Sequence, residues 1–353
     1  MKLDVCSLVV YVAGRAMISV LLPFRDAVAT LHDALASTLA DLGPDDELVV
    51  IDDGSSDGSA AIAATLAARD ARLVPIRSGS AAHAAGVGGS LAQGLAIARG
   101  ALIARMDGDD LTLPGRFAAQ RALLERDATL GAVGVRVEGF PAPGPGMLRY
   151  LAWQASLITP ADHARAVFCE APLCHPSTML RRAALDAVGG WRENEWSQDY
   201  DLWLRLDAAG YRFAKVPEVL FRWRIQRSSK TWTDPRNSLP RLLLLRAMHL
   251  AHRLRVLGRP FHVWGAGKTG RRLARALEAY DLRARGFVDI DPAKVGRTAR
   301  GVAIIGAAAG IALAASGEHL LLVAVGEPGA RDQVRARLDA AGLIEGRDYV
   351  CAA

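Results

Sequence analysis

Three aspartates within four residues form the first pattern in this sequence that could carry chemistry. Asp107 and Asp109 stand two positions apart at the end of the predicted strand ALIARMD, and Asp110 is expected to face elsewhere. Because alternate side chains of an extended chain point the same way, Asp107 and Asp109 project together. Two carboxylates at that spacing offer hard oxygen ligands to Mg²⁺ or Mn²⁺ and leave room for phosphate oxygens. A solvated acidic turn would show the same letters, so the motif alone is weak evidence.

A second acidic cluster, DDGSSD, directly follows a buried apolar run that ends at Ile51. Its glycine permits a tight turn, and Ser56, Asp57 and Ser59 are residue types that form turns and cap a following helix. Asp53 is the better ligand candidate, because a carboxylate at the C-terminal end of a strand can accept an N–H of a nucleobase.

A further aspartate, Asp199, lies at the start of a helix predicted over Gln198–Ala209. Asp199 shares one helix face with Leu202 and Trp203, whereas Asp201 is turned about 200° away by the helical period. We therefore expect Asp199 and Asp201 to lie on different faces of this helix. Asp201 is expected to interact with the helix dipole.

The elements that would position these aspartates alternate along the chain. Strands are predicted at ISVLLP, ELVVID, RLVPI and ALIARMD, with helices over 27–40, 59–69 and 87–99 between them. This alternation predicts an α/β fold with a mostly parallel sheet that is covered on both faces. Ligands of such sheets bind at the C-terminal ends of the strands, where Pro23, Phe24 and the acidic loops lie.

Six segments in one order resemble the family 2 glycosyltransferases, a large inverting family with the GT-A fold. The segments lie within residues 17–232 and read ISVLLPFRDA, VVIDDGSSDGS, GVGGSLAQGLAIARGALIARMDGDD, CHPSTMLRR, GGWRENEWSQDYDLWLRLDAAGYRFAKVPEVL and FRWRIQRSS. The resemblance implies that Asp53 recognises the base of a nucleotide sugar, that Asp109 is the principal metal ligand with Asp107 assisting, and that Asp199 is the general base. The donor nucleotide site is then expected to comprise Pro23, Phe24, Asp53, Asp107 and Arg224.

The chain departs from the family pattern at two positions. Gln198 stands where the family usually has glutamate, which removes one negative charge beside the diphosphate, and we expect activity to survive. The family element Tyr-Arg-x-His reads Trp-Arg-Ile-Gln here, and Gln226 cannot supply an imidazole ligand. Any contact with the pyrophosphate would then fall to Arg224, Arg222 or Arg227.

Two more residues are cleft candidates with an alternative that stays open. His175 stands where the family commonly places a cleft residue, although a lone histidine is more often structural. Trp191 could stack on a sugar ring or pack in the core.

A glycine-rich turn marks the C-terminal part of the chain. Gly265-Ala-Gly-Lys-Thr-Gly270 lies between a strand and a helix, and Asp289 follows Gly270 by 19 residues at the end of the next strand. This pattern is typical of dinucleotide-binding turns, in which glycines let the pyrophosphate approach and the acid binds ribose hydroxyls. We expect a second nucleotide site, for NAD or another nucleotide, that comprises Gly265, Gly267, Lys268, Gly270 and Asp289.

The same region has a resemblance of its own. GFVDIDPAKVG resembles the N-terminal nucleotide-fold domain of sialic-acid-type sugar acetyltransferases. The unit is too short for a complete two-half dehydrogenase and shows no evident Tyr/Lys or Cys/His catalytic pair. A binding or docking module is therefore favoured over a redox enzyme.

The length of 353 residues suits two domains. We predict an N-terminal extension at 1–16, which fits a start codon called too early, and a GT-A domain at 17–235. A basic helical linker at 236–257 would join it to a small Rossmann-like domain at 258–353. Hydrophobic residues make up 51% and charged residues 23%, which argues against long disorder.

Charge and cysteine content bound the partners and the compartment. The formal net charge of +6 is carried mostly by scattered arginines, which suits an anionic small substrate or a membrane surface and gives no reason to expect nucleic acid. The four cysteines form no CxxC pair, as in a reducing compartment. The longest charge-free stretch, 301–317, is too short to span a bilayer. We expect a cytoplasmic protein with peripheral contact at the inner face of the membrane through the helix at 241–257, or a solvated connector there.

Together these patterns predict a metal-dependent inverting glycosyltransferase of surface polysaccharide assembly, with Mn²⁺ or Mg²⁺ as cofactor. Its donor would be a nucleotide sugar, with a UDP-sugar favoured, and its acceptor a saccharide or a lipid-linked hydroxyl. One alternative is a nucleotidyltransferase, although the loop PFRD lacks the glycine-rich basic sequence that such enzymes need. The other is a nucleotide-sugar or NAD-binding regulatory protein without transferase activity.

Overall fold

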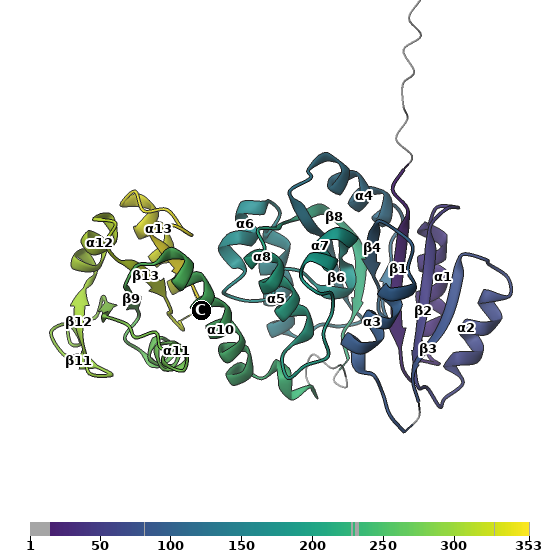
Figure 1. Cartoon of the computed structure of the whole chain (residues 1–353), viewed down its shortest axis with the longest axis horizontal. Coiled ribbons are helices and arrows are strands. Elements are labelled where there is room, and N and C mark those ends of the chain that lie inside the picture. The colour runs from purple at the N-terminus through teal and green to yellow at the C-terminus, as the bar shows by residue number, and fades with distance from the viewer. Residues whose placement is uncertain (1–14, 81, 227–228, 230–232, 328, 353) are drawn as a thin grey trace, which may run out of the picture.

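The computed structural model describes residues 15–80, 82–226, 229, 233–327 and 329–352. Our expectations for residues 1–14 and for Arg227 lie outside these residues. The described chain forms two β-sheets, and Figure 1 shows them as two lobes with a long helix between them.

Four parallel strands form the part of the first sheet that the sequence alternation predicted. Their order is β3-β2-β1-β4. Helices cover both faces: Leu21 of the first strand packs in one core cluster with Leu91, and its neighbour Leu22 packs in another with Leu31. The elements are β1 (Ile18–Phe24), α1 (Leu31–Asp41), β2 (Glu47–Asp53), α2 (Ser59–Ala67), β3 (Leu73–Gly79), α3 (Gly86–Ile97) and β4 (Leu102–Arg105).

The first helix begins later than the predicted residue 27. The backbone N–H of Ala27 donates to Ser59 Oγ at 2.8 Å, and that of Val28 donates to Asp57 Oδ2 at 2.9 Å. These bonds fasten the loop after β1 to the loop after β2, so α1 starts only at Leu31. The turn-forming interpretation of Ser59 and Asp57 is thus consistent with their contacts.

The other half of this sheet contains two antiparallel strands, so the sheet is mixed, although most of its strands run in one direction as the sequence predicted. The strand β7 runs antiparallel to β4 and to β6, β8 runs parallel to β6, and β5 runs antiparallel to β8. The elements are β5 (Leu111–Thr112), α4 (Arg116–Arg126), β6 (Leu130–Phe140), α5 (Pro145–Ser156), α6 (Pro160–Ala166), β7 (Met179–Arg181), α7 (Arg182–Ala187), α8 (Gln198–Ala208) and β8 (Arg212–Arg224), with the short 3₁₀ helices η1 (His175–Ser177) and η2 (Pro235–Asn237).

The second sheet contains five parallel strands and one antiparallel edge strand, in the order β11-β12-β10-β9-β13-β14. The strand order reverses at β9, since β10 lies on one side of it and β13 on the other. The elements are β9 (Phe261–Trp264), α11 (Lys268–Glu278), β10 (Gly286–Asp289), β11 (Thr298–Ala299), β12 (Val302–Gly306), α12 (Ala307–Ala315), β13 (Leu320–Val323), α13 (Ala330–Ala340) and β14 (Tyr349–Cys351).

The helix α10 (Leu239–Leu257) connects the two sheets and packs against α8 and α11. Its buried residues include Leu245, Leu250 and Leu254, which belong to a core cluster that also contains residues of both sheets. A solvated connector is therefore wrong for this helix, because one of its faces is part of the core. The C-terminus lies beside α10 in Figure 1, and Arg246 of α10 donates to the Ala352 carbonyl at 3.3 Å.

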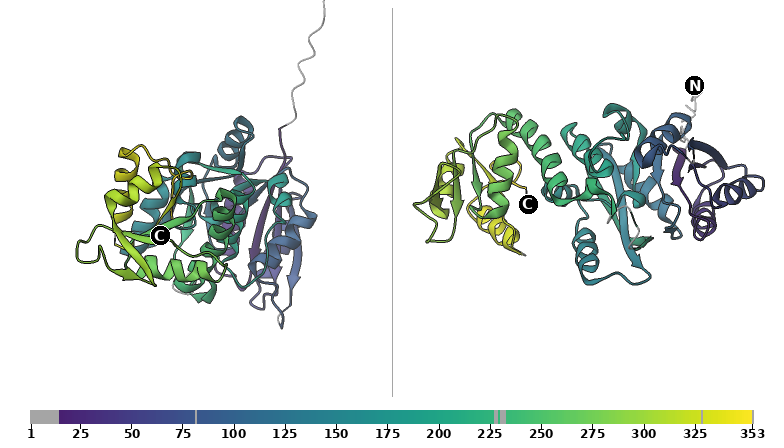
Figure 2. Two further views of the ribbon diagram at one scale, coloured as in Figure 1. Left: turned by 60° about the vertical axis from the view of Figure 1, so that its left-hand side comes forward. Right: turned by 90° about the horizontal axis from the view of Figure 1, so that it is seen from below.

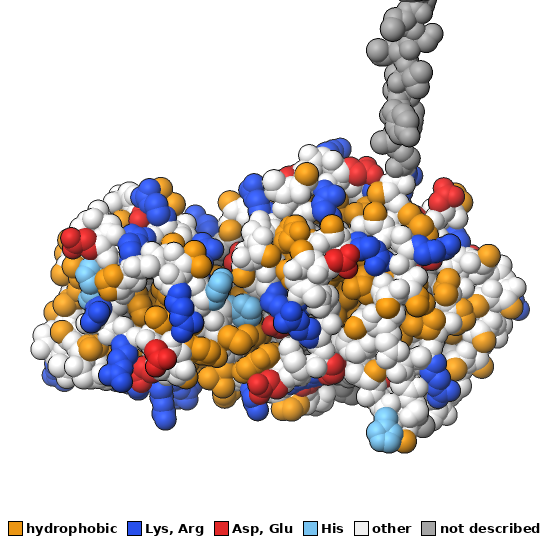
Figure 3. All heavy atoms as spheres, viewed as in Figure 1, with side chains coloured by type: hydrophobic (Ala, Val, Ile, Leu, Met, Phe, Trp, Pro, Cys, Tyr) orange, Lys and Arg blue, Asp and Glu red, His pale blue; other side chains and the backbone are white. Residues whose placement is uncertain are grey.

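The length of the helices and the distribution of basic side chains bear on the membrane contact expected from the sequence. No helix among the described residues is long and apolar enough to cross a bilayer. On the face shown in Figure 3, lysine and arginine side chains are spread over both lobes and do not gather in one patch. Figure 2 shows from two further sides that α10 lies between the lobes.

Candidate active site

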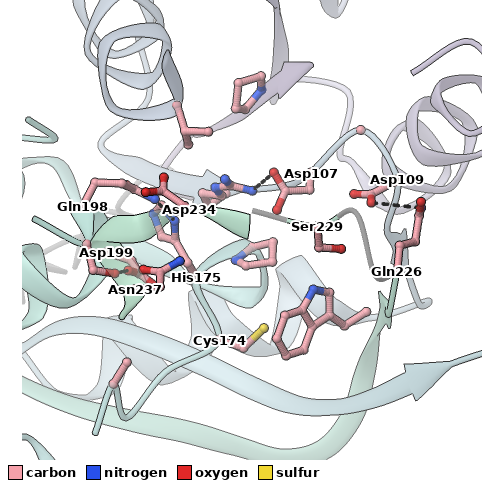
Figure 4. A pocket seen from close by; sticks show the side chains of 18 of the residues that line it. Asp107, Asp109, Cys174, His175, Gln198, Asp199, Gln226, Ser229, Asp234 and Asn237 are labelled. Carbon is pink, nitrogen blue, oxygen red and sulfur yellow. Dashed lines mark hydrogen bonds and ion pairs between the residues drawn. The ribbon is translucent and has the colours of Figure 1, made fainter. Parts of the chain in front are cut away.

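A cleft of about 780 Å³ lies at the C-terminal ends of the parallel strands of the first sheet. Loops after β1, β2 and β4 line one side of it. The opposite side comes from α5, from the segment before η1, from the start of α8 and from the region of η2. In Figure 4, Asp107 and Asp109 lie on one side of this pocket and Gln198, Asp199 and His175 on the other.

The acidic cluster follows β4. Asp107, Asp109 and Asp110 each offer a carboxylate oxygen, and these oxygens lie within 4.8 Å of one another. The prediction that Asp110 faces elsewhere is wrong, because β4 ends at Arg105 and the turn beyond it does not follow the alternation of a strand. Asp110 is fully buried beneath the other two, with Oδ1 accepting the backbone N–H of Arg224 at 2.7 Å.

The electrostatics of this cluster suit a cation. Burial, followed by repulsion from Asp107, raises the pKa of Asp109 to about 6. Burial also raises the pKa of Asp110 well above its usual range, and Oδ2 of this residue is buried without a hydrogen-bond partner among the described residues. A set of hard, mutually repelling oxygens that includes an unpartnered one fits Mg²⁺ or Mn²⁺.

Arg224 supports the acidic turn and does not line the cleft. Its Nε donates to the Asp109 carbonyl at 2.7 Å, and its guanidinium lies 4.5 Å from the centre of the Phe140 ring. The prediction that Arg224 contacts the donor is therefore corrected: pairing of β8 with β6 sets Arg224 opposite Phe140, away from the cleft. Gln226 lines the cleft instead and donates to Asp109 Oδ2 at 3.4 Å.

The predicted donor residues Pro23, Phe24 and Asp53 all line the cleft. Both carboxylate oxygens of Asp53 are engaged, because Oδ1 accepts the N–H of Ala85 at 2.6 Å and Oδ2 that of Gly86 at 3.1 Å. Asp53 thus anchors the start of α3. Each oxygen retains a second lone pair, so the contact with a nucleobase stays a prediction.

Asp199 lies at the wall of the cleft in the first turn of α8. Its Oδ1 accepts the hydroxyl of Ser197 at 2.7 Å and the backbone N–H of Tyr200 at 2.8 Å. Asp201 is turned away, as the helical period predicts, and pairs with Arg205 at 2.8 Å and with His249 of α10 at 3.6 Å. Its contacts therefore link two helices, beyond the dipole interaction expected for it.

Trp191 and His175 form a buried pair. The Trp191 side chain is 3% exposed and lies outside the cleft, so the stacking interpretation is wrong and the core-packing alternative describes it. Its indole N–H donates to His175 Nε2 at 2.8 Å. Burial lowers the pKa of His175 well below its usual range, so the ring is neutral and its proton is on Nδ1. That nitrogen lies 3.3 Å from the Gln198 amide, whose oxygen can accept the proton when the amide is rotated by 180°.

Several cleft residues are absent from the sequence predictions, and three of them are aromatic or acidic side chains of the wall. Tyr150, Glu170 and Trp223 line it, and the rings of Tyr150 and Trp223 lie edge to face at 6.5 Å. The position of Trp223 in the family element was a signal for its place. Glu170 belongs to none of the six segments, so no sequence signal marked it as a cleft residue.

The glycine turn of the second sheet shows close backbone packing. A Cβ on Gly270 would lie 1.9 Å from the Gly265 carbonyl, which only glycine permits, and α11 begins at Lys268. Asp289 is engaged within the protein, because Oδ2 accepts the N–H of Ala266 at 3.0 Å and the ammonium of Lys294 at 3.2 Å. Burial alone would raise the pKa of Asp289. The hydrogen bonds from the backbone N–H groups of Asp291 and Ala266 and from Lys294 outweigh burial, so the pKa of Asp289 is lowered.

Comparisons with known proteins decide the family. A sequence model described as Glycosyl transferase family 2 matches residues 19–189. The putative glycosyltransferase EpsE of Bacillus subtilis is 32% identical over 211 residues, which are 59% of this chain and 72% of EpsE. The chain belongs to glycosyltransferase family 2. The amylovoran biosynthesis glycosyltransferase AmsE of Erwinia amylovora is 29% identical over 51% of this chain and 64% of AmsE.

The fold has solved counterparts. Residues 1–349 of TarS from S. aureus, in complex with UDP-GlcNAc, superpose with a TM-score of 0.53 at 15% identity, over 76% of this chain and 74% of that one. The predicted GT-A fold is thereby confirmed for this glycosyltransferase. The match to the family model ends before the second sheet.

Proposed function

We propose that this glycosyltransferase moves a sugar from a nucleoside-diphosphate sugar to a hydroxyl of a saccharide or lipid-linked acceptor, with inversion and with the help of a divalent cation. The observation that carries the proposal is the placement of the acidic cluster and of Asp199 on opposite sides of one cleft. Inversion requires that the acceptor attack the face of the sugar opposite the leaving group, and this placement suits that approach.

On the donor side, Asp107 and Asp109 would hold Mn²⁺ or Mg²⁺, with Oδ2 of Asp110 beneath them. When bound, the cation supplies charge neutralisation for the departing diphosphate. Arg224 fixes the Asp109 backbone, and Gln226 orients the Asp109 carboxylate. Asp53 with Pro23 and Phe24 would hold the nucleoside.

On the other side, Asp199 is the general base for the acceptor hydroxyl. The N-terminal end of α8 favours its negative charge, and the Ser197 hydroxyl fixes one oxygen. A positioned carboxylate within reach of the attacking hydroxyl takes its proton as the bond to the sugar forms. The base and the metal site are thus separate groups with separate tasks.

A UDP-sugar is the favoured donor, and surface polysaccharide is the favoured setting. The support is that TarS was solved with UDP-GlcNAc and that AmsE is named for amylovoran biosynthesis. The direct test is a panel of UDP-, GDP- and dTDP-sugars, with release of nucleoside diphosphate measured in Mn²⁺ and in EDTA. We expect turnover with one donor and its loss in EDTA, and the anomeric configuration of the product, read by NMR, to be opposite to that of the donor. Retention, or equal rates in EDTA, would contradict the proposal.

For the second sheet we propose a Rossmann-like binding module for a nucleotide, such as NAD, at the turn of Gly265, Gly267 and Gly270. The observation that favours it is the start of α11 beside β9, where the strand order reverses. Lys268 adds positive charge there, and Asp289 would have to share its bonds with a ribose.

A substitution at Gly267 tests this module in the intact chain. A Cβ at Gly267 meets no atom within 4 Å and its backbone is extended, so Gly267→Val keeps the fold and fills the space a phosphate would occupy. We expect NADH fluorescence to report binding to the wild type that Gly267→Val abolishes. Equal binding by both proteins would contradict the site.

A further inference from the structure

Glu170 is an acidic side chain in the cleft that the proposed donor, metal and base sites do not use. It follows α6 and lines the cleft opposite the acidic cluster. Within the described part of the chain its carboxylate accepts one hydrogen bond, from the backbone N–H of Ala171 at 3.0 Å. Most of the hydrogen-bonding capacity of this carboxylate is thus unused.

The backbone beside Glu170 is fixed from behind. Arg246 of α10 donates to the Cys169 carbonyl at 2.9 Å and to the Ala352 carbonyl at 3.3 Å, and the Cys169 thiol lies 3.6 Å from the Cys351 carbonyl. The second sheet and α10 therefore support the segment that carries Glu170. A side chain on a supported backbone can hold a ligand in one orientation.

Groups from other elements act on the charge of Glu170. Burial raises the pKa of Glu170, and the negative charge of Asp199 raises it further, while Arg246 acts in the opposite direction. Burial is the main cause that raises the pKa of the Tyr150 hydroxyl in α5. Among the charged groups, Glu170 raises this pKa most. Tyr150, Glu170 and Asp199 all line the same cleft and come from three elements distant in the sequence.

The chemistry of these groups restricts what binds there. An ionised carboxylate only accepts hydrogen bonds, so its complement is a set of donors such as neighbouring sugar hydroxyls. Glu170 and Asp199 line one cleft, and their two negative charges there would repel a further carboxylate or a phosphate. The Tyr150 ring offers an apolar surface for the C–H face of a sugar.

We propose that Glu170 binds the acceptor sugar through its hydroxyl groups and limits this part of the cleft to sugars without a negative charge. The bound hydroxyls hold the attacking one against Asp199. The diphosphate of a lipid-linked acceptor would lie away from this position. The inference rests on the proposed function and names the specificity residue of its acceptor site.

The experiment compares Glu170→Gln with Glu170→Ala and with the control Glu218→Gln, an exposed residue of β8 outside the cleft. The donor is the nucleotide sugar that the donor panel selects. The acceptors are a panel of p-nitrophenyl hexosides, each with the corresponding uronide, so that members of a pair differ only by a carboxylate. Donor hydrolysis without acceptor is measured for every protein, as are thermal melting and saturation-transfer NMR of the acceptors.

We expect Glu170→Gln and Glu170→Ala to raise the acceptor KM by about 10- to 100-fold, the usual effect of losing hydrogen bonds to a charged group. Donor hydrolysis and the donor KM should be unchanged. The preference of the wild type for the hexoside over its uronide should fall at least about tenfold in both variants, since the repelling charge is gone. Glu218→Gln should resemble the wild type throughout.

Other outcomes separate the two levels of the argument. If the Glu170 variants leave the acceptor KM and the preference for the hexoside unchanged, Glu170 does not bind the acceptor. If they lower kcat at an unchanged acceptor KM, Glu170 acts as a base, and its proposed binding role is overturned as well. If the wild type hydrolyses the donor but neither transfers the sugar to any glycoside nor shows NMR contact with one, the acceptor site is not at this position. Absence of turnover of every donor would instead contradict the proposed function.

Discussion

The two sides of the cleft are built in different ways. The donor side consists of loops that directly follow parallel strands, and its acidic side chains are already held by backbone groups, as Asp53 is by Ala85 and Gly86 and Asp110 is by Arg224. The acceptor side brings together α5, the segment after α6 and the start of α8, and its Glu170 is largely unpartnered. A preformed donor site beside a less committed acceptor site lets one fold keep its donor chemistry while acceptors vary.

The largest test of this division is the base. We expect Asp199→Asn to lower kcat by about 10²- to 10⁴-fold, the usual contribution of a positioned base. Donor and Mn²⁺ binding, measured by calorimetry, should be unchanged because Asp199 lies across the cleft from the acidic cluster. The matched control is Asp201→Asn, which should reduce thermal stability through its lost pairs with Arg205 and His249 and leave kcat near that of the wild type. Near-normal turnover in Asp199→Asn would show that Asp199 is not the general base.

The next test concerns the cation. Asp109→Ala should remove the dependence of donor affinity on Mn²⁺, which we expect to be about 10²-fold in the wild type, because a divalent cation screens the diphosphate. Calorimetry with UDP-sugar, with and without Mn²⁺, measures the ratio directly. Slow donor hydrolysis in Asp109→Ala that still responds to Mn²⁺ would mean that the cation binds elsewhere.

The same contrast shows what the sequence could predict. Strand-end motifs are local, so the positions of β1 to β4 along the chain, the start of α8 and the place of Asp107, Asp109 and Asp199 at one cleft could be predicted. The end of α10 at Leu257 also followed from its local pattern. What the sequence could not predict depended on distant pairing: β7, three residues long, runs antiparallel to both of its neighbours within a sheet that is otherwise mostly parallel.

The individual errors have the same origin. Arg224 was assigned to the donor from its motif, but the pairing of β8 with β6 sets it against Phe140. Trp191 was left open between ligand and core, and only the position of His175 beside it decides the matter. Glu170 could not be found, because nothing near it in the sequence marks it and its neighbours in space come from two other elements.

Arg224 provides a smaller test of how the donor side is held. Arg224→Ala should weaken Mn²⁺ binding about tenfold, because the Asp109 carbonyl loses its donor and the acidic turn is less well fixed. Arg222→Ala is a close control, since Arg222 also stacks on Phe140 but pairs with Glu138 away from the cleft. Mn²⁺ titration of both variants separates the two, and equal affinities would show that the turn holds its shape without Arg224.

The smallest effect is expected at Gln198, which lies beside His175 on the same side of the cleft as Asp199. Its amide oxygen can accept the Nδ1 proton of the neutral His175, and a glutamate at this place would accept the same proton. Gln198→Glu therefore keeps the hydrogen bond and adds one negative charge beside His175 and near Asp199. We expect kcat to change by less than about fivefold, since an added charge in a solvated cleft costs on the order of 1 kcal/mol at most. Gln198→Leu, which cannot accept the proton, leaves a buried donor unsatisfied and should reduce kcat and thermal stability more than Gln198→Glu does. Should Gln198→Glu instead abolish turnover while donor binding persists, the charge of this position, and not its hydrogen bond to His175, would govern the acceptor side.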